Sequence, residues 1–288
     1  MFGAQITTSL ASAGVFVAAI AIGTHLSSYA LSRGLKNPPL TLLGPLAISF
    51  GFLAVTPILL LAAVLGIYSP PVFGLIGWIV TGFIRFRLPR NAGRRLREPV
   101  SLGLLLVAVS AALLAFFTAG EHLYGGRDQG FYTNIAIWMA HNGKTVVDVP
   151  LGLKDQELLR ALGPGILGSG LYFDHGHIVS QFSHAYPAWL AQAFAVGGHV
   201  GIDVMNAFLA GTCVLLFFAV ARSLMRSGPA LIATAFLAFS PAQIWISRIT
   251  LSELLAQQAF LSMSILLVWA VRLKCPRLIL ARTASDFD

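Results

Sequence analysis

Most residues capable of acid–base or metal chemistry gather in one stretch of the chain, residues 119–185. This stretch carries more than half of the eleven acidic residues and more than half of the seven histidines. They are Glu121, Asp128, Asp148, Asp155, Glu157 and Asp174, with His122, His141, His175, His177 and His184. Long apolar runs with few ionisable groups flank the stretch, so we expect the chemistry of the protein to lie here.

Asp128 stands at the predicted start of a helix. Two glycines precede it, a largely apolar stretch follows, and Asn142-Gly143 ends that stretch. The pattern predicts an Asp at the helix N-terminus, about three helical turns and a glycine stop. Asp128 has two compatible interpretations. It is an N-cap that satisfies free backbone N–H groups, or a carboxylate positioned to take a proton from an acceptor hydroxyl or amine.

Other polar residues near the predicted membrane surface also allow a structural and a functional interpretation. Tyr132 packs its ring against the loop or contacts a substrate. Thr250 and Glu253 have the spacing of a capping box, which competes with a substrate role for Glu253. Arg248 reaches phospholipid head groups or binds a specific anion.

A metal site is a further possibility for the histidines. Asp174, His175, His177 and His184 have side chains of metal-ligand types. Their spacing fits no known zinc motif, so we expect a solvated loop, with no metal and no cofactor.

The composition places the chain in the membrane class. Hydrophobic residues make up 57% of the sequence and charged residues 10%, and the mean hydropathy is +0.80. A soluble domain carries roughly 25% charged residues. The apolar residues fall in runs that match the roughly 20 residues of helix needed to cross a bilayer.

The apolar runs predict an all-α membrane protein with about seven transmembrane helices and a large external loop containing interfacial helices. The expected spans are 9–31, 41–66, 70–86, 100–118, 202–222, 229–246 and 254–272. The apolar segment Tyr186–Val196 is too short to span, so we expect it to lie on the outer surface of the membrane.

The basic residues predict the orientation. By our count, 14 of the 19 Lys and Arg residues fall at the same end of the predicted helices, mainly in 85–97 and after residue 271. The positive-inside rule makes that end cytoplasmic, in a plasma or inner membrane. The N-terminus and residues 119–185 are then external and the C-terminus is cytoplasmic. The net charge of +8 is explained by topology and by contact with membrane lipids, and we expect no nucleic-acid partner.

Three stretches together resemble the GT-C fold glycosyltransferases, the polytopic enzymes that use polyprenyl-phosphate sugars. Gly126–Tyr132 with the following helix resembles their first external loop, closest to the protein mannosyltransferase and lipid A aminoarabinose transferase branch. Tyr186–Leu190 resembles the proline-containing helix after that loop. Residues 240–253 resemble the family's proline, arginine and serine-glutamate sequence. The resemblance covers roughly residues 100–272.

The resemblance implies a function and a set of site residues. It implies that Asp128 activates the acceptor during inverting transfer and that Arg248 contacts the phosphate of the polyprenyl-phosphate sugar donor. Arg127, Tyr132, Glu253 and His184 lie in or beside the same external motifs and are the remaining candidate substrate-binding residues. The acceptor is not indicated.

The chain also departs from that family. Gln129 stands where the family often has a second carboxylate, which argues against a metal site there. We divide the chain into N-terminal helices with a basic loop (1–99), a GT-C-like module (100–272) and a cytoplasmic tail (273–288). Related enzymes continue for several more spanning helices, so we expect this chain to be a truncated form. The alternative function is a non-catalytic membrane protein, either a permease fragment or a scaffold that binds envelope lipids.

Overall fold

The protein is built almost entirely of helices. The computed structural model describes residues 2–32, 40–84, 99–120, 128–148, 171–174, 177–180 and 182–272. The helices are α1 (Phe2–Ser32), α2 (Leu40–Val64), α3 (Pro70–Phe83), α5 (Pro99–Phe117), α6 (Gln129–Asn142), α8 (Ala185–Leu224), α9 (Ser227–Ala238), α10 (Pro241–Ser247) and α11 (Glu253–Arg272).

Four helices in the described ranges are long and apolar enough to cross a membrane: α1, α2, α8 and α11. A fifth span results if α9 and α10 are counted together. This is compatible with a multi-pass membrane protein, but the expected seven spans are not confirmed. The expected span 70–86 corresponds to α3, which has 14 residues and is therefore only about 21 Å long. In α5, Leu102–Phe117 also counts among the shorter apolar helices.

The expected span 229–246 corresponds to two helices, α9 and α10, and not to one continuous helix. The chain bends by 59° between α9 and α10. Pro241 has no N–H to continue the α9 ladder, and Ser240 before it is extended (φ −67°, ψ 143°). The Ser240 hydroxyl then caps α10 by accepting a hydrogen bond from the Gln243 N–H at 3.2 Å.

The segment Tyr186–Val196 is joined to the expected span 202–222 in the single helix α8. The helix breaks at Gly197 and Gly198, where the sequence predicted the segment to end. Gly198 has φ 61° and ψ −143°, a conformation essentially restricted to glycine.

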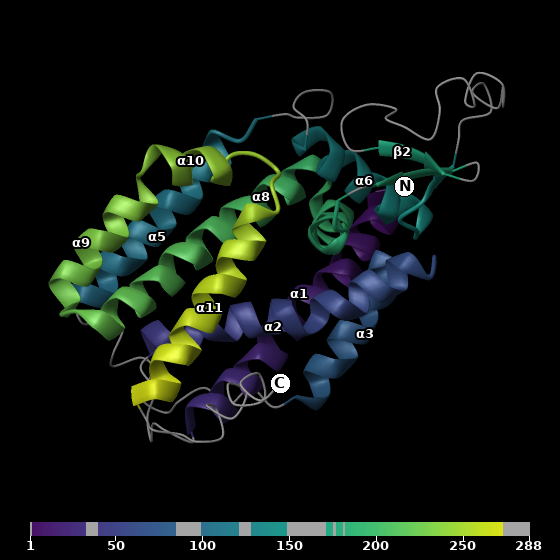
Figure 1. The fold of residues 1–288 in the computed structure, drawn as a ribbon. Helices are drawn as coiled ribbons and strands as arrows, with labels where there is room; N and C mark the ends of the chain where they lie inside the picture. The colour runs from purple at the N-terminus through teal and green to yellow at the C-terminus, as the bar shows by residue number, and fades with distance from the viewer. Residues whose placement is uncertain are drawn as a thin grey trace, which may run out of the picture.

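Helix α8 is the centre of the bundle and packs against α1, α2, α5, α6, α9 and α11 (Figure 1). Its fully buried Trp189 stacks on Phe52 of α2 with 4.1 Å between ring centroids. The indole N–H of Trp189 donates to the Thr56 hydroxyl at 2.8 Å. The first half of α8 is therefore fixed to α2 by both apolar and polar contacts.

The predicted all-α fold is confirmed, and one small antiparallel sheet accompanies the helices. Its strands are β1 (Val147–Asp148), β2 (Leu171–Asp174) and β3 (His177–Ser180), in the order β1-β3-β2. Asp174 pairs with His177 across the β2–β3 hairpin. Strands β2 and β3 thus replace the solvated loop that the sequence predicted around these residues.

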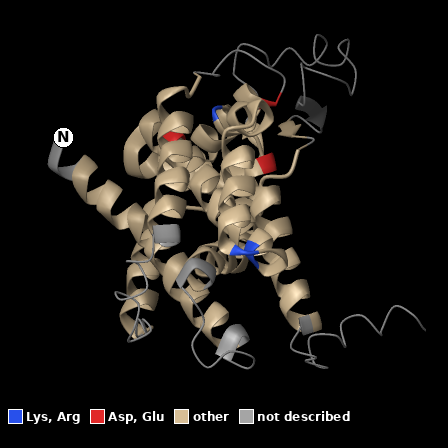
Figure 2. Cartoon of the chain, turned by 90° about the vertical axis from the view of Figure 1, so that its left-hand side faces the viewer, with Lys and Arg blue, Asp and Glu red and all other residues tan. Residues whose placement is uncertain are grey.

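The polar elements lie at one end of the bundle. Figure 1 shows α6, β2 and α10 along the upper edge, whereas the C-terminal ends of α1, α3 and α11 point to the lower edge. In Figure 2 the described helices are almost wholly tan, and the acidic residues drawn in red lie in the upper half. The end that carries α6 is therefore the end at which a polar site is built.

Two fully buried glutamines give a matched test of the packing. Gln192 Nε2 donates to the Ser12 carbonyl (2.6 Å) and the Pro70 carbonyl (3.0 Å), and its Oε1 accepts from the Tyr68 hydroxyl at 3.0 Å. The side-chain amide of Gln258 has no hydrogen-bond partner among the described residues. A buried unpaired polar group costs about 1–3 kcal/mol.

We therefore expect Gln192→Leu to lower the melting temperature in detergent, because it removes three buried hydrogen bonds, to Ser12, Pro70 and Tyr68. Gln258→Leu is expected to keep or raise it, because it removes an unpaired amide. Scanning fluorimetry of both variants measures the difference. Equal losses in the two variants would contradict the hydrogen-bond assignment.

Candidate functional site

The connection between α10 and α11 (residues 248–252) is hydrogen-bonded to α8 and to the residues after α5. The Gly120 N–H, just after α5, donates to the Arg248 carbonyl at 3.1 Å. The Asn206 Nδ2 of α8 donates to the Ile249 carbonyl at 3.2 Å. Tyr186, also in α8, donates its hydroxyl hydrogen to the Asn206 Oδ1, which orients the amide. The backbone that presents Arg248 is therefore fixed from two sides.

Two hydroxyl groups of this connection, those of Thr250 and Ser252, make contacts with the start of α6. The Thr250 hydroxyl donates to the Gln129 carbonyl at 2.8 Å. The Thr133 hydroxyl lies 2.9 Å from the Thr250 hydroxyl. The Ser252 hydroxyl lies 3.1 Å from the Tyr132 hydroxyl. The two segments that resembled separate parts of one family site thus pack directly on each other.

Tyr132 is the aromatic centre of this cluster. Its ring is 5% exposed and meets Tyr186 edge to face, with 5.6 Å between centroids. Burial raises the pKa of the Tyr132 hydroxyl, and the hydrogen bond to Ser252 acts in the opposite direction. The nearby carboxylates of Glu253 and Asp128 raise this pKa further. Tyr132 therefore keeps its proton at neutral pH.

Asp128 occupies the N-cap position of α6, as the sequence predicted. Its side chain makes no capping hydrogen bond, however, and its backbone is helical (φ −103°, ψ −33°). The residue is half-buried and close enough to Tyr132 to act on it electrostatically. The carboxylate is thus not used to cap the helix.

The end of α6 follows the prediction. Gly143 is left-handed (φ 71°), and its N–H donates to the Met139 carbonyl at 2.9 Å. The Gly143 carbonyl accepts from the Tyr68 N–H at 3.1 Å. The far end of α6 is therefore held by the turn between α2 and α3.

Arg248 and Glu253 sit at opposite ends of the connection, and both side chains are exposed. Arg248 is the C-cap residue of α10 and Glu253 is the first residue of α11. The capping-box prediction was wrong, because the Thr250 hydroxyl bonds to α6 and the helix begins at Glu253. An acid in the first turn still complements the helix dipole.

His184 precedes α8 and is half-buried. Its Nε2 is buried and has no hydrogen-bond partner within the described ranges. Burial lowers the pKa of His184, so its imidazole is neutral at neutral pH. It is two residues from Tyr186, which contacts Tyr132.

Arg127 lies outside the described residues, as do Glu121, His122 and His175. In the part of the chain that the structure describes, no three His, Cys, Asp or Glu side chains are grouped as metal ligands. The structure thus brings Asp128 and Glu253 close to the Tyr132 hydroxyl. Arg248 lies at the start of the hydrogen-bonded connection that leads to Glu253.

Neither a protein-family model, nor a curated protein, nor a solved structure matches this chain.

Two residues of the site were missed at the sequence level. Asn206 is 3% exposed and orients the connection. Asp203, one turn before it, is close enough to Tyr186 to act on it electrostatically. Their three-residue spacing on the apolar run 202–222 places both on one helix face. A polar pair on such a run was the available signal.

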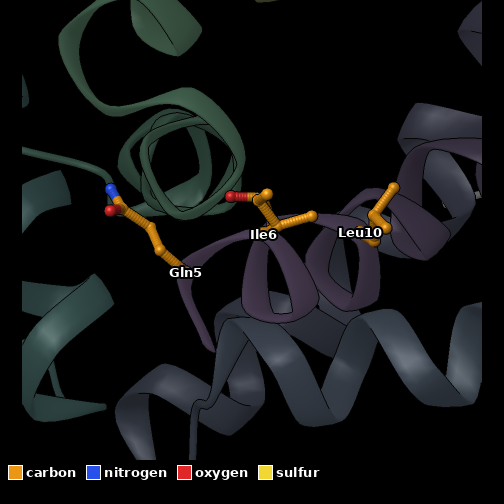
Figure 3. A pocket seen from close by; sticks show the side chains of 4 residues that line it. Gln5, Ile6 and Leu10 are labelled. Carbon is orange, nitrogen blue, oxygen red and sulfur yellow. The ribbon is translucent and has the colours of Figure 1, made fainter. Parts of the chain in front are cut away.

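A shallow open pocket lies elsewhere, at the start of α1. It has a volume of about 350 Å³ and is lined by Gln5, Ile6, Ser9 and Leu10. Figure 3 shows Ile6 and Leu10 along α1, with Gln5 extended from the same helix. None of the four is an acid, a base or a nucleophile matched to a partner, so we assign no chemistry to this pocket.

Proposed function

We propose that the protein is a membrane glycosyltransferase that moves a sugar from a polyprenyl-phosphate donor to an acceptor on the external face of the membrane. One observation carries the proposal. A carboxylate not used for capping, Asp128, directly precedes a helix that is hydrogen-bonded to the connection between Arg248 and Glu253. This cluster sits at one end of an apolar bundle, where a lipid-linked head group would be found.

The proposed reaction is a single displacement. The acceptor hydroxyl or amine attacks the anomeric carbon, a new bond forms there, and the bond from that carbon to the phosphate oxygen breaks. The phosphate leaves with the bonding electrons as polyprenyl phosphate. Asp128 takes the acceptor proton, and the configuration at the anomeric carbon is inverted.

Arg248 is assigned to the donor phosphate. A guanidinium binds two phosphate oxygens at once, and its exposure leaves it free to meet a head group at the membrane surface. Tyr132, Glu253, His184 and Arg127 are the other proposed substrate contacts. The isoprenoid tail lies between helices in this proposal, and no metal takes part.

The proposed orientation places the N-terminus and residues 119–185 outside a plasma or inner membrane, with the C-terminus in the cytoplasm. It is supported by the basic clusters of the sequence and by the grouping of α6, β2 and α10 at one edge of the bundle.

Native mass spectrometry of protein purified gently from its own membranes tests the donor site. We expect an isoprenoid phosphate to remain bound to the wild type and to be lost from Arg248→Ala. Arg226→Ala, which removes an arginine at the start of α9, is the matched control and is expected to keep the lipid. Ordinary phospholipid alone on the wild type would favour the non-catalytic alternative.

A further inference from the structure

Thr250 makes the most direct contact between the two halves of the candidate site. It is 6% exposed and lies in the α10–α11 connection. Its hydroxyl donates to the Gln129 carbonyl at 2.8 Å and lies 2.9 Å from the Thr133 hydroxyl. The single Thr250 hydrogen goes to Gln129, so the Thr133 hydroxyl donates to the Thr250 oxygen.

The partners of this hydrogen bond are near neighbours of Asp128 and Arg248 in the chain. Gln129 directly follows Asp128, and Thr250 is two residues after Arg248. Neighbouring Cα atoms are about 3.8 Å apart, so the hydrogen bond joins backbones within one or two residues of both groups. Loss of this bond would let the start of α6 shift relative to the connection.

Other contacts hold each segment without joining these two points. Asn206 and Gly120 fix the connection to α8 and to the end of α5. Gly143 fixes the far end of α6 to the α2–α3 turn. The Tyr132–Ser252 contact lies one helical turn after Asp128, and Ser252 follows Thr250 in the chain whereas Arg248 precedes it. The Thr250 hydroxyl is therefore the group that hydrogen-bonds next to Asp128 from a position two residues after Arg248.

We propose that Thr250 is a positioning residue that sets the separation of the proton-accepting carboxylate and the phosphate-binding arginine. This inference rests on the proposed function and adds to it a residue that touches neither substrate. Because a misplacement of about 1 Å can cost roughly 10²-fold in rate, the effect falls on kcat. The donor KM stays near that of the wild type, because Arg248 and its backbone contacts are unchanged.

The test uses two substitutions of Thr250 and one control. Thr250→Val keeps the shape of the side chain and removes the hydroxyl, whereas Thr250→Ser keeps the hydroxyl. Thr234→Val is the control, because Thr234 is equally buried and bonds only to the Ala230 carbonyl of its own helix. Kinetics are measured on the full chain with a polyprenyl-phosphate sugar.

We expect Thr250→Val to lower kcat by about 10- to 100-fold with little change in donor KM. Thr250→Ser should recover most of the rate, and Thr234→Val should match the wild type. Hydrogen exchange gives a second readout, with faster exchange expected in peptides from the first turns of α6 in Thr250→Val alone. If Thr250→Val fails to accumulate, the same measurements are made on Thr133→Val, which removes the hydrogen bond between the Thr133 and Thr250 hydroxyls.

Different results would contradict the positioning role of Thr250 and the proposed function. If the wild type transfers sugar and Thr250→Val matches Thr234→Val in kcat, the positioning role is wrong and the proposed function stands. If the loss in Thr250→Val is entirely in KM, or follows its melting temperature, the role is likewise wrong. If the folded wild type transfers no sugar, the proposed function fails and takes the positioning role with it.

Discussion

Replacing Asp128 with asparagine is expected to lower the rate of sugar transfer by about 10²–10⁴-fold, the usual contribution of a positioned general base. The amide keeps the size of the carboxylate but cannot take the acceptor proton. The folded state should be little affected, because the Asp128 side chain makes no capping hydrogen bond and α6 does not depend on it.

The measurement is the initial rate of polyprenyl phosphate release, together with the melting temperature of each variant. Asp148→Asn provides the control, since it removes a carboxylate from β1 and not from the start of α6. A wild-type rate in Asp128→Asn would remove Asp128 from the proposed mechanism. A large fall in melting temperature would show that the residue is structural after all.

The second large effect is expected where α1 and α3 cross. A Cβ added at Gly74 would lie 1.8 Å from the Ala11 carbonyl oxygen, and one added at Gly14 would lie 2.0 Å from the Gly74 oxygen. The two backbones are therefore in direct contact, as at the small-residue crossings of membrane helices. Gly74→Ala forces the helices apart, and overpacking of this kind costs about 1–3 kcal/mol or more.

We expect Gly74→Ala to melt clearly below the wild type in detergent. Gly82→Ala, in the same helix, is the control, because nothing lies within 4 Å of its added Cβ. Equal melting temperatures for the two variants would mean that α1 and α3 do not cross as closely as the structure has them.

Local signals in the sequence predicted α6 well. Asp128 stands at the start of α6, although without the predicted capping hydrogen bond, and Gly143 ends the helix through its left-handed backbone. The break at Gly197-Gly198 was found for the same reason, since glycine alone accepts the conformation of Gly198. Pro241 was an equally local signal for the bend after α9, but the apolar run across it was read as one span.

The parts that the sequence did not reveal depend on distant partners. Thr250 and Glu253 fit a local capping pattern, yet the Thr250 hydroxyl bonds to Gln129, which lies 121 residues away. Asn206 finds the Ile249 carbonyl 43 residues away. Strand β1 pairs with β3 across the stretch 149–176, and all three strands are too short to show an alternating pattern. Tertiary contacts decided these features, and local preference did not.

The most direct test of the central claim is transfer by the wild-type protein itself. The purified protein is incubated with labelled polyprenyl-phosphate sugars and with its own membranes as the source of acceptor. We predict release of polyprenyl phosphate that depends on the acceptor, and a product with inverted configuration at the anomeric carbon. A folded protein that transfers no sugar from any such donor would contradict the assignment as a glycosyltransferase.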